Sequence, residues 1–227
     1  MPSLTQLLAK HQRILVLDAA SKQFQAGLLR EDHPSLWELT DADASTGIFT
    51  CAQAVLSDAG LRIADLGAVA FCEGPGSMLG IRSVAMAIRT WRVLAPLAVY
   101  SYGSLAVAGQ FEWRSHPARP LTVIADARRG SWHCLSVAAG GEMGSLQRLA
   151  SDQLPVGDLV TPENFRSWDL PPRPVSNARY DLARIFPALR DFDCFRATTS
   201  PNAFQVEPTE YRRWTARIHQ AAAAGSS

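Results

Sequence analysis

Short apolar runs alternate with polar turn residues along the first half of the chain. Three such runs come close together at the start, and we predict that they form an antiparallel meander. The predicted strands of this half cover residues 13–19, 24–30, 36–39, 66–72 and 97–100.

Two helical segments lie between these strands. From Thr46 to Ala59 apolar residues recur at three- and four-residue intervals, which is the stripe of an amphipathic helix, and Gly60 is placed to end it. Residues 78–94 form a second helical segment, which Pro96 stops. This order of elements predicts a mixed sheet flanked by helices, and the opening meander argues against a purely parallel dinucleotide-binding sheet.

The pattern is weaker in the second half of the chain, where prolines between residues 155 and 174 break any long element. A strand pair is expected around the turn 126–130. The predicted elements are helices at 104–110 and 180–189 and strands at 121–125 and 132–138.

Composition and charge narrow the class of protein. The 227 residues suit one large or two small domains, and 47% hydrophobic with 19% charged residues is typical of a soluble globular chain. The net charge of +1 excludes a polyanion-binding tail. The four cysteines lack CxxC spacing, so we expect reduced, partly buried thiols. Without a leader or a membrane-length apolar run, we expect a cytoplasmic protein.

A glycine-rich segment links the fourth predicted strand to the second helix. It contains Gly74, Pro75, Gly76, Ser77 and Gly80. Backbone N–H groups at a helix start can bind an anion, but this segment matches neither the dinucleotide nor the P-loop fingerprint. The alternative is a tight turn with Ser77 as the N-cap of the helix.

Three carboxylates lie at or just after predicted strand ends. They are Asp18, Glu73 and Asp126. Acids gathered at neighbouring strand ends can hold Mg²⁺ for phosphodiester chemistry. The alternative is that they cap turns, as Asp126 can do at the first position of its turn. Histidines at HxxxH spacing and a G-x-S-x-G elbow are absent from the sequence, so we assign neither a catalytic residue nor a metal ligand.

The helix at 78–94 carries a second face that is small and weakly polar, formed by Ser83, Met86, Ala87 and Thr90. A lone exposed helix is expected to carry charges there, so this face indicates packing against another helix, from this chain or from a partner. The arginines that flank it are Arg82, Arg89 and Arg92. They are read either as partner contacts or as solvated surface.

Several segments in order resemble one family. They are ILVLDAAS at 14–21, the glycine segment with its helix at 63–91, the turn at 123–130, and Pro208 to Arg212. The combination is similar to the TsaB (YeaZ) family, which takes part in forming threonylcarbamoyladenosine in tRNA. The resemblance covers residues 13–140 well and the remainder thinly.

The resemblance implies an α/β fold of the actin-like ATPase class (sugar kinase, Hsp70, actin, RNase H-like). It implies a first domain at 1–110, a smaller degenerate second domain at 111–219, and a disordered tail at 220–227. It also implies a non-catalytic scaffold that binds the catalytic paralogue TsaD through its helices, with a TsaE-like ATPase completing the complex. Without its partner the chain is expected to form a homodimer, and it contacts tRNA only indirectly.

One departure from the family concerns nucleotide binding. Asp18 and Ser21 frame a candidate, degenerate phosphate loop, in which Ala19 and Ala20 replace the family's hydroxyl residues. We therefore expect no cofactor of its own, with any nucleotide bound at the interface with the catalytic partner. The alternatives are an RNase H-like Mg²⁺ nuclease that uses the three carboxylates, and an autonomous kinase-like enzyme, which the short second half and the missing hydroxyls disfavour.

Overall fold

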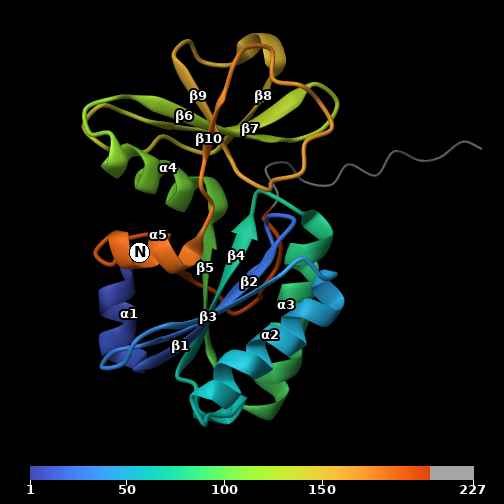
Figure 1. The fold of residues 1–227 in the computed structure, drawn as a ribbon, viewed down its shortest axis with the longest axis vertical. Helices are drawn as coiled ribbons and strands as arrows, with labels where there is room; N and C mark the ends of the chain where they lie inside the picture. The colour runs from blue at the N-terminus through green and yellow to red at the C-terminus, as the bar shows by residue number, and fades with distance from the viewer. Residues whose placement is uncertain (205–227) are drawn as a thin grey trace, which may run out of the picture.

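The computed structural model describes residues 1–204, arranged in two sheets with helices beside and between them (Figure 1). The first sheet has the strand order β11-β5-β4-β1-β2-β3. Its strands are β1 (Arg13–Asp18), β2 (Phe24–Arg30), β3 (Leu36–Thr40), β4 (Ala68–Gly74), β5 (Ala98–Gly103) and β11 (Arg196–Ala197). The predicted antiparallel meander is confirmed in β1, β2 and β3, while β4 and β5 continue the sheet in parallel to β1.

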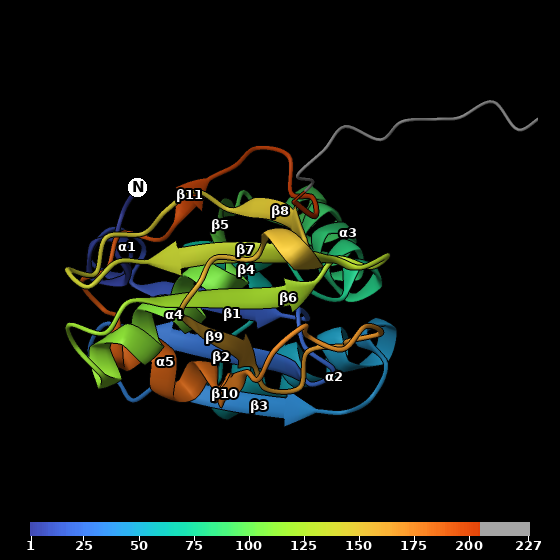
Figure 2. The ribbon, with the colours of Figure 1, turned by 90° about the horizontal axis from the view of Figure 1, so that it is seen from above.

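The second sheet repeats the pairing of the first. Its order is β10-β9-β6-β7-β8, with β6, β7 and β8 antiparallel and β9 and β10 parallel to β6. Its strands are β6 (Leu121–Asp126), β7 (Ser131–Val137), β8 (Gln147–Ala150), β9 (Asp158–Pro162) and β10 (Ser176–Ala178). Seen from above, the strands of both sheets lie roughly along the same axis of the molecule (Figure 2). This duplication agrees with the predicted two-part, actin-like class.

Helices cover both faces of the first sheet. They are α1 (Leu4–His11), α2 (Ala44–Asp58), α3 (Met78–Leu94), α4 (Ser104–Ser115) and α5 (Leu182–Ala188), with single 3₁₀ turns at Ile63–Asp65 and Ser151–Gln153. Helices α2 and α3 lie together on one face, while α1 and α5 lie on the other, and α4 lies between the two sheets (Figure 1). Between β6 and β10 the chain forms only the 3₁₀ turn at Ser151–Gln153 and no α-helix, so this stretch holds fewer helices than the first half.

Periodicity explains why α3 forms and where it packs. Ile81, Val84, Ile88 and Trp91 are buried at three- and four-residue intervals, and they join one core layer with α2 and the sheet. A second, larger core layer fills the space between the first sheet, α1, α4, α5 and the second sheet. The predicted thiols are also confirmed, because all four cysteines are free and buried.

The predicted domain boundary differs from the observed path of the chain. Residue 110 lies inside α4, and after β10 the chain returns to the first half, where α5 packs near β2 and β11 pairs with β5. Within residues 1–204, the chain therefore leaves the second sheet after β10 and rejoins the first sheet at β11. The predicted tail at 220–227 and the resemblance at Pro208 to Arg212 lie outside the described residues.

Helix α1 was not predicted, although the sequence holds a signal for it. The Ser3 side chain accepts a hydrogen bond from the Gln6 N–H, and the Gln6 side chain accepts one from the Ser3 N–H, which is a capping box. Across residues 1–204 no helix is long and apolar enough to cross a membrane.

A buried polar cluster joins the start of the chain to the returning segment. The Asp18 carboxyl, fully buried at the end of β1, accepts hydrogen bonds from the hydroxyls of Tyr102 (2.8 Å) and Tyr180 (2.7 Å) and from the Ala20 N–H (2.8 Å). The Gln25 side chain donates to the Tyr180 carbonyl and accepts from the Leu182 N–H, both at 3.0 Å. These contacts place the segment that leads into α5.

The aromatic side chain of Phe186 fills the space beside this cluster. Its ring is fully buried and stacks on Phe195 at 5.6 Å and on Trp37 at 6.3 Å, while Tyr102 meets it edge-on at 5.2 Å. Helix α5 is therefore part of the core of the first half.

We expect Phe186→Ala to lower the free energy of unfolding by about 3–5 kcal/mol, because the variant removes a buried ring and leaves a cavity. Urea denaturation followed by circular dichroism measures this loss. Phe192→Ala, at a partly buried ring that packs against the same core, is the matched control and should cost less. A loss of about 1 kcal/mol or less for Phe186→Ala would contradict the packing described for α5.

A second prediction concerns the pH dependence of stability. Burial raises the pKa of the Asp18 carboxyl above its usual 3.8, although its hydrogen bonds act in the opposite direction. Above that pH the unfolded chain releases the proton while the folded chain retains it, so this group lowers stability as pH rises toward the folded pKa. The slope reaches at most about 1.4 kcal/mol per pH unit.

In Asp18→Asn this contribution to the slope should disappear, because the amide is neutral at every pH. Urea midpoints of the variant and the parent, measured from pH 4 to pH 8, should therefore diverge in favour of the variant as pH rises. If both chains keep the same pH dependence, Asp18 does not carry this proton.

Candidate functional site

The glycine segment forms a close contact with the loop that follows β1. Gly74 and Gly76 adopt φ angles of 112° and 155°, which confirms the predicted tight turn. A Cβ at Gly76 would lie 2.5 Å from the carbonyl oxygen of Ala20, and one at Gly80 would lie 2.7 Å from that of Ala19. Glycine is therefore required at these two positions because the backbones pack directly on each other.

Ser77 stands at the N-cap of α3, as predicted, but its side chain makes no capping hydrogen bond. Its backbone N–H donates instead to the Ala20 carbonyl at 2.8 Å. Pro75, between the two glycines, accepts a hydrogen bond from the Ser104 hydroxyl at 2.5 Å. The turn is thus tied to two neighbouring segments of the chain.

In the candidate phosphate loop, the side chains of Asp18 and Ser21 are both engaged in internal hydrogen bonds. The Asp18 oxygens are occupied by the two tyrosine hydroxyls and the Ala20 N–H, and the Ser21 hydroxyl donates to the Gln23 carbonyl at 2.7 Å and accepts from the Gln23 N–H. Both side chains are buried. The loop also packs onto the glycine turn, and Ala19 and Ser21 line a pocket together with Ser77 and Gly80 at the start of α3.

The three carboxylates do not share a metal site. Asp18 is sealed in the core, and Glu73 forms an ion pair with Arg196 at 2.6 Å. Asp126 accepts hydrogen bonds from the backbone of its own turn and of the loop at 167–169. Among residues 1–204, no group of three or more metal-binding side chains lies together. The alternative of an RNase H-like Mg²⁺ nuclease is therefore wrong, because it requires the three carboxylates to converge on one ion.

Asp126 instead confirms its alternative interpretation as a turn cap. It accepts from the N–H groups of Arg128 (2.5 Å), Trp168 (2.6 Å) and Asp169 (2.8 Å). Partial burial alone would raise the pKa of this carboxyl, but the three backbone donors more than offset it and hold the pKa below its usual value. The ionised carboxylate thus fixes the turn and the loop against each other.

The predicted partner face of α3 is only partly exposed. Met86 is 57% exposed and Arg82 is also on the surface, but Ala87 is only 4% exposed and belongs to the core layer shared with α2. The placement of Ala87 at an outer interface was therefore wrong, because its small side chain lets α3 pack within the chain.

Two of the flanking arginines bind the chain itself. Arg89 donates to the Pro201 carbonyl at 2.5 Å, and Arg92 donates to the Thr199 carbonyl at 2.6 Å. These contacts hold the segment at 199–203 along α3. Arg89 and Arg92 thus bind a later segment of the same chain, a contact that their spacing along the helix did not indicate.

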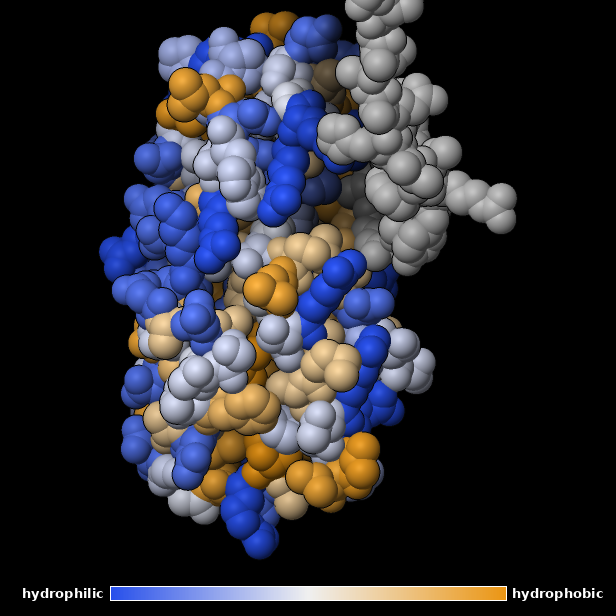
Figure 3. Space-filling view, turned by 90° about the vertical axis from the view of Figure 1, so that its right-hand side faces the viewer, coloured by the Kyte–Doolittle hydropathy of each residue, from blue (hydrophilic) through white to orange (hydrophobic). Residues whose placement is uncertain are grey.

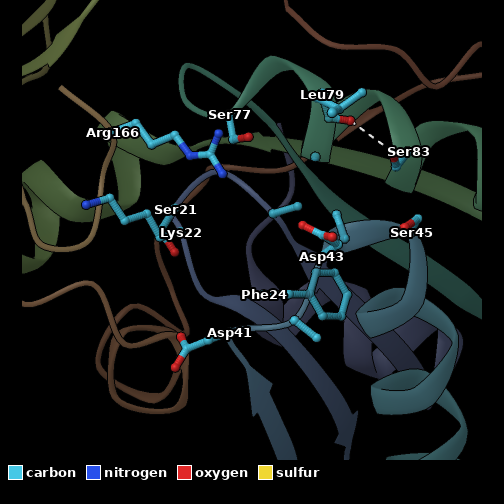
Figure 4. Close-up of a pocket in the computed structure, with 14 residues that line it drawn as sticks. Ser21, Lys22, Phe24, Asp41, Asp43, Ser45, Ser77, Leu79, Ser83 and Arg166 are labelled. Carbon is cyan, nitrogen blue, oxygen red and sulfur yellow. Dashed lines mark hydrogen bonds between the residues drawn. The ribbon is translucent and has the colours of Figure 1, made fainter. Parts of the chain in front are cut away.

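A pocket of about 330 Å³ opens between the starts of α2 and α3. Its lining includes the cations Lys22 and Arg166 and the acids Asp41 and Asp43, and the Arg166 side chain reaches toward Ser77 (Figure 4). Leu79 and Ser83 of α3 form the opposite wall. The formal charges of these four side chains cancel.

Sequence reasoning missed Phe49 and Arg166. Phe49 lies outside the apolar stripe of α2, is 50% exposed and meets Trp91 edge-on at 6.0 Å, and an apolar residue on the polar side of a helix was the signal for it. Arg166 reaches the pocket from the connection between β9 and β10. No spacing in the sequence links that connection to the starts of α2 and α3.

Comparison with known proteins gives the family. The family model described as TsaD, tRNA N6-adenosine threonylcarbamoyltransferase, matches residues 38–154. The curated Escherichia coli protein named tRNA threonylcarbamoyladenosine biosynthesis protein TsaB is 28% identical over 120 residues, which are 52% of this chain and 52% of that protein. The matched region thus spans about half the length of that relative.

Two solved structures from Pseudomonas aeruginosa share the fold. YeaZ aligns with a TM-score of 0.62 at 22% identity over 80% of this chain and 91% of its own. An uncharacterized protein with similarity to peptidase YeaZ aligns with a TM-score of 0.61 at 21% identity over 78% and 89%. Because the family model matches more than half of the 227 residues, the chain belongs to the TsaD family, in which it is assigned to the TsaB (YeaZ) proteins.

Proposed function

We propose that this chain is a non-catalytic subunit in the formation of N6-threonylcarbamoyladenosine beside the anticodon of tRNA, and that it binds a TsaD-like catalytic paralogue. Membership of the family and the similarity to a TsaB named for this biosynthesis support the process. We infer the partner and the scaffold role from the exposed surface of the chain.

The observation that carries the proposal is the outer face of α2 and α3. Phe49 is 50% exposed, Met86 57% and Leu79 79%, and apolar side chains gather on this side of the molecule (Figure 3). A subunit that stays alone in water rarely exposes large apolar side chains together, and such patches mark sites of protein contact.

The polar residues of the same face are satisfied within their helices. The Ser83 hydroxyl donates to the Leu79 carbonyl at 3.0 Å, and the Thr90 hydroxyl donates to the Met86 carbonyl at 3.1 Å. Hydroxyls bonded to the preceding turn leave no unmet donor when another helix covers them. The face is thus suited to a helix bundle with the equivalent helices of a paralogue.

We assign the catalysis of threonylcarbamoyl transfer to the TsaD-like partner. In this chain the carboxylates considered for catalysis are engaged in internal bonds, and Ala19 and Ala20 supply no side-chain hydroxyl to the loop at 18–21. A nucleotide of the complex is therefore expected to be held mainly by the catalytic subunit at the interface. A TsaE-like ATPase completes the assembly, and without the partner the same face is expected to pair two copies of this chain.

We expect Met86→Glu to weaken binding to the TsaD-like partner by at least about thirtyfold, because the variant places a charge in the centre of an apolar interface. The fold should be unaffected, since the side chain is largely exposed. Co-purification of the tagged full chain from the source organism, followed by titration with the purified partner, measures the effect. Leu79→Asp should act in the same direction.

Val156→Glu is the matched control, because Val156 is 98% exposed and lies before β9, in the second half of the molecule. It should retain the partner. Ala87→Glu is unsuitable, because its charge would enter the core. Undiminished partner binding by Met86→Glu would remove the α2–α3 face from the proposal.

The process itself has a separate test. Depletion of this chain in the source organism should lower the threonylcarbamoyladenosine content of bulk tRNA several-fold, because the catalytic subunit loses its activating partner. Mass spectrometry of digested tRNA nucleosides measures the content, and re-expression of the parent chain is the control. An unchanged content after depletion would refute the proposed function.

A further inference from the structure

A basic and aromatic surface is formed where the β6–β7 turn meets the β9–β10 connection, and we call it the Trp168 platform. Its members are Lys22, Arg128, Arg129, Arg166 and Trp168. Trp168 is 58% exposed, and the guanidinium carbon of Arg128 lies 4.2 Å from the centre of its ring. An exposed indole against a guanidinium group offers both a stacking surface and positive charge.

The platform is held rigidly by the ionised Asp126. Its carboxylate accepts hydrogen bonds from the backbone N–H groups of Arg128, Trp168 and Asp169. The Asp169 carboxylate in turn accepts a hydrogen bond from the Gly130 N–H at 2.8 Å. Asp126 and Asp169 therefore both bind backbone donors. Because its two segments are locked together, the platform loses little conformational freedom when it binds a ligand.

The backbone of the turn is strained so as to present two arginines in succession. Arg128 and Arg129 have φ angles of 65° and 57°, a left-handed conformation that a side chain other than glycine, asparagine or aspartate rarely adopts. Strain of this kind persists where the surrounding contacts enforce it, and it gathers at functional sites. The strain here displays two guanidinium groups from one tight turn.

Two members of the platform, Lys22 and Arg166, also line the pocket between the starts of α2 and α3. The Lys22 N–H donates to the Asn164 carbonyl at 2.7 Å, which brings the β1–β2 turn beside the connection that carries Arg166 and Trp168. Within residues 1–204, the exposed side chains of Lys22, Arg129 and Arg166 form no ion pair. Lys22 and Arg166 share the pocket with Asp41 and Asp43, whose charges offset theirs, so the cations that the platform adds are Arg128 and Arg129 of the β6–β7 turn.

We propose that the Trp168 platform binds a single-stranded RNA segment directly, with a base stacked on Trp168 and the neighbouring phosphates neutralised by the arginines. Stacking on an aromatic ring accepts any base, and guanidinium groups match phosphate geometry, so an unpaired RNA segment fits both parts of the surface. An acidic peptide would use the charge but not the exposed indole. The proposal rests on the proposed function in one respect, since the RNA is taken to be the tRNA of the modification complex.

The near-neutral charge of the chain had favoured only an indirect contact with tRNA. The platform changes that expectation locally, because a few fixed cations beside a stacking residue suffice for a secondary contact. The main electrostatic attraction to tRNA can still come from the catalytic partner.

The test uses the full chain and a fluorescein-labelled anticodon stem–loop RNA, titrated by fluorescence anisotropy. Trp168→Ala should weaken binding about tenfold, whereas Trp168→Phe should stay close to the parent because it keeps a stacking ring. Arg128→Ala should weaken binding and reduce the dependence of log Kd on log salt by about one. Arg184→Ala, at an exposed arginine of α5, is the matched control and should bind like the parent.

Equal affinity of the parent and Trp168→Ala would overturn the proposal. So would equal competition by a fully paired RNA stem, or a poly-glutamate peptide whose binding depends equally on Trp168. The proposed function is judged separately, by the nucleoside content after depletion and by partner binding of Met86→Glu. If those two succeed while RNA affinity is indifferent to Trp168, only the RNA contact fails.

Discussion

The buried carboxyl of Asp18 is the constraint around which the molecule is built. A carboxyl taken fully out of water is unfavourable unless it is hydrogen-bonded, and here two tyrosine hydroxyls and one backbone N–H converge on it. Tyr102 brings β5 to this point, and Tyr180 brings the segment that returns from the second sheet. The position of α5, and with it the return of the chain to β11, therefore depends on a polar contact at the end of β1.

The same constraint decides what the neighbouring loop can do. Once Asp18 is turned into the core, residues 19–21 close over it and pack on the glycines at the start of α3. The N–H of Ser77 is used by the carbonyl of Ala20, so a helix start that is suited to an anion in general is here part of the internal structure. The two surfaces that we propose for partner and RNA contact lie outside this contact, on the outer faces of α2 and α3 and on the Trp168 platform.

The sequence allowed prediction where local pattern decides the structure. Residues 24–30 and 78–94 were predicted with the bounds that the structure has, because alternation and helical periodicity are local properties. Met86 and Ala87 show where this stops, since the pattern placed both on one face, whereas burial depends on how closely α2 approaches. The ion pair of Glu73 with Arg196 and the caps supplied by Asp126 join residues far apart in sequence, and no local signal predicts such pairs.

The duplicated sheet explains why the second half carries a different kind of surface. Asp18 and Asp126 occupy equivalent places, at the ends of β1 and β6, but only Asp126 bonds directly to the segment that follows the neighbouring parallel strand. After β4 that segment is a glycine turn leading into α3, whereas after β9 it is an irregular connection that leads to β10 without a helix. Because the backbone N–H groups of this connection are not bonded within a helix, those of Trp168 and Asp169 can donate to Asp126, and the Trp168 side chain is left exposed. Where the first half places helix α3, the second half therefore has a loop that is fixed by Asp126 and exposes Trp168.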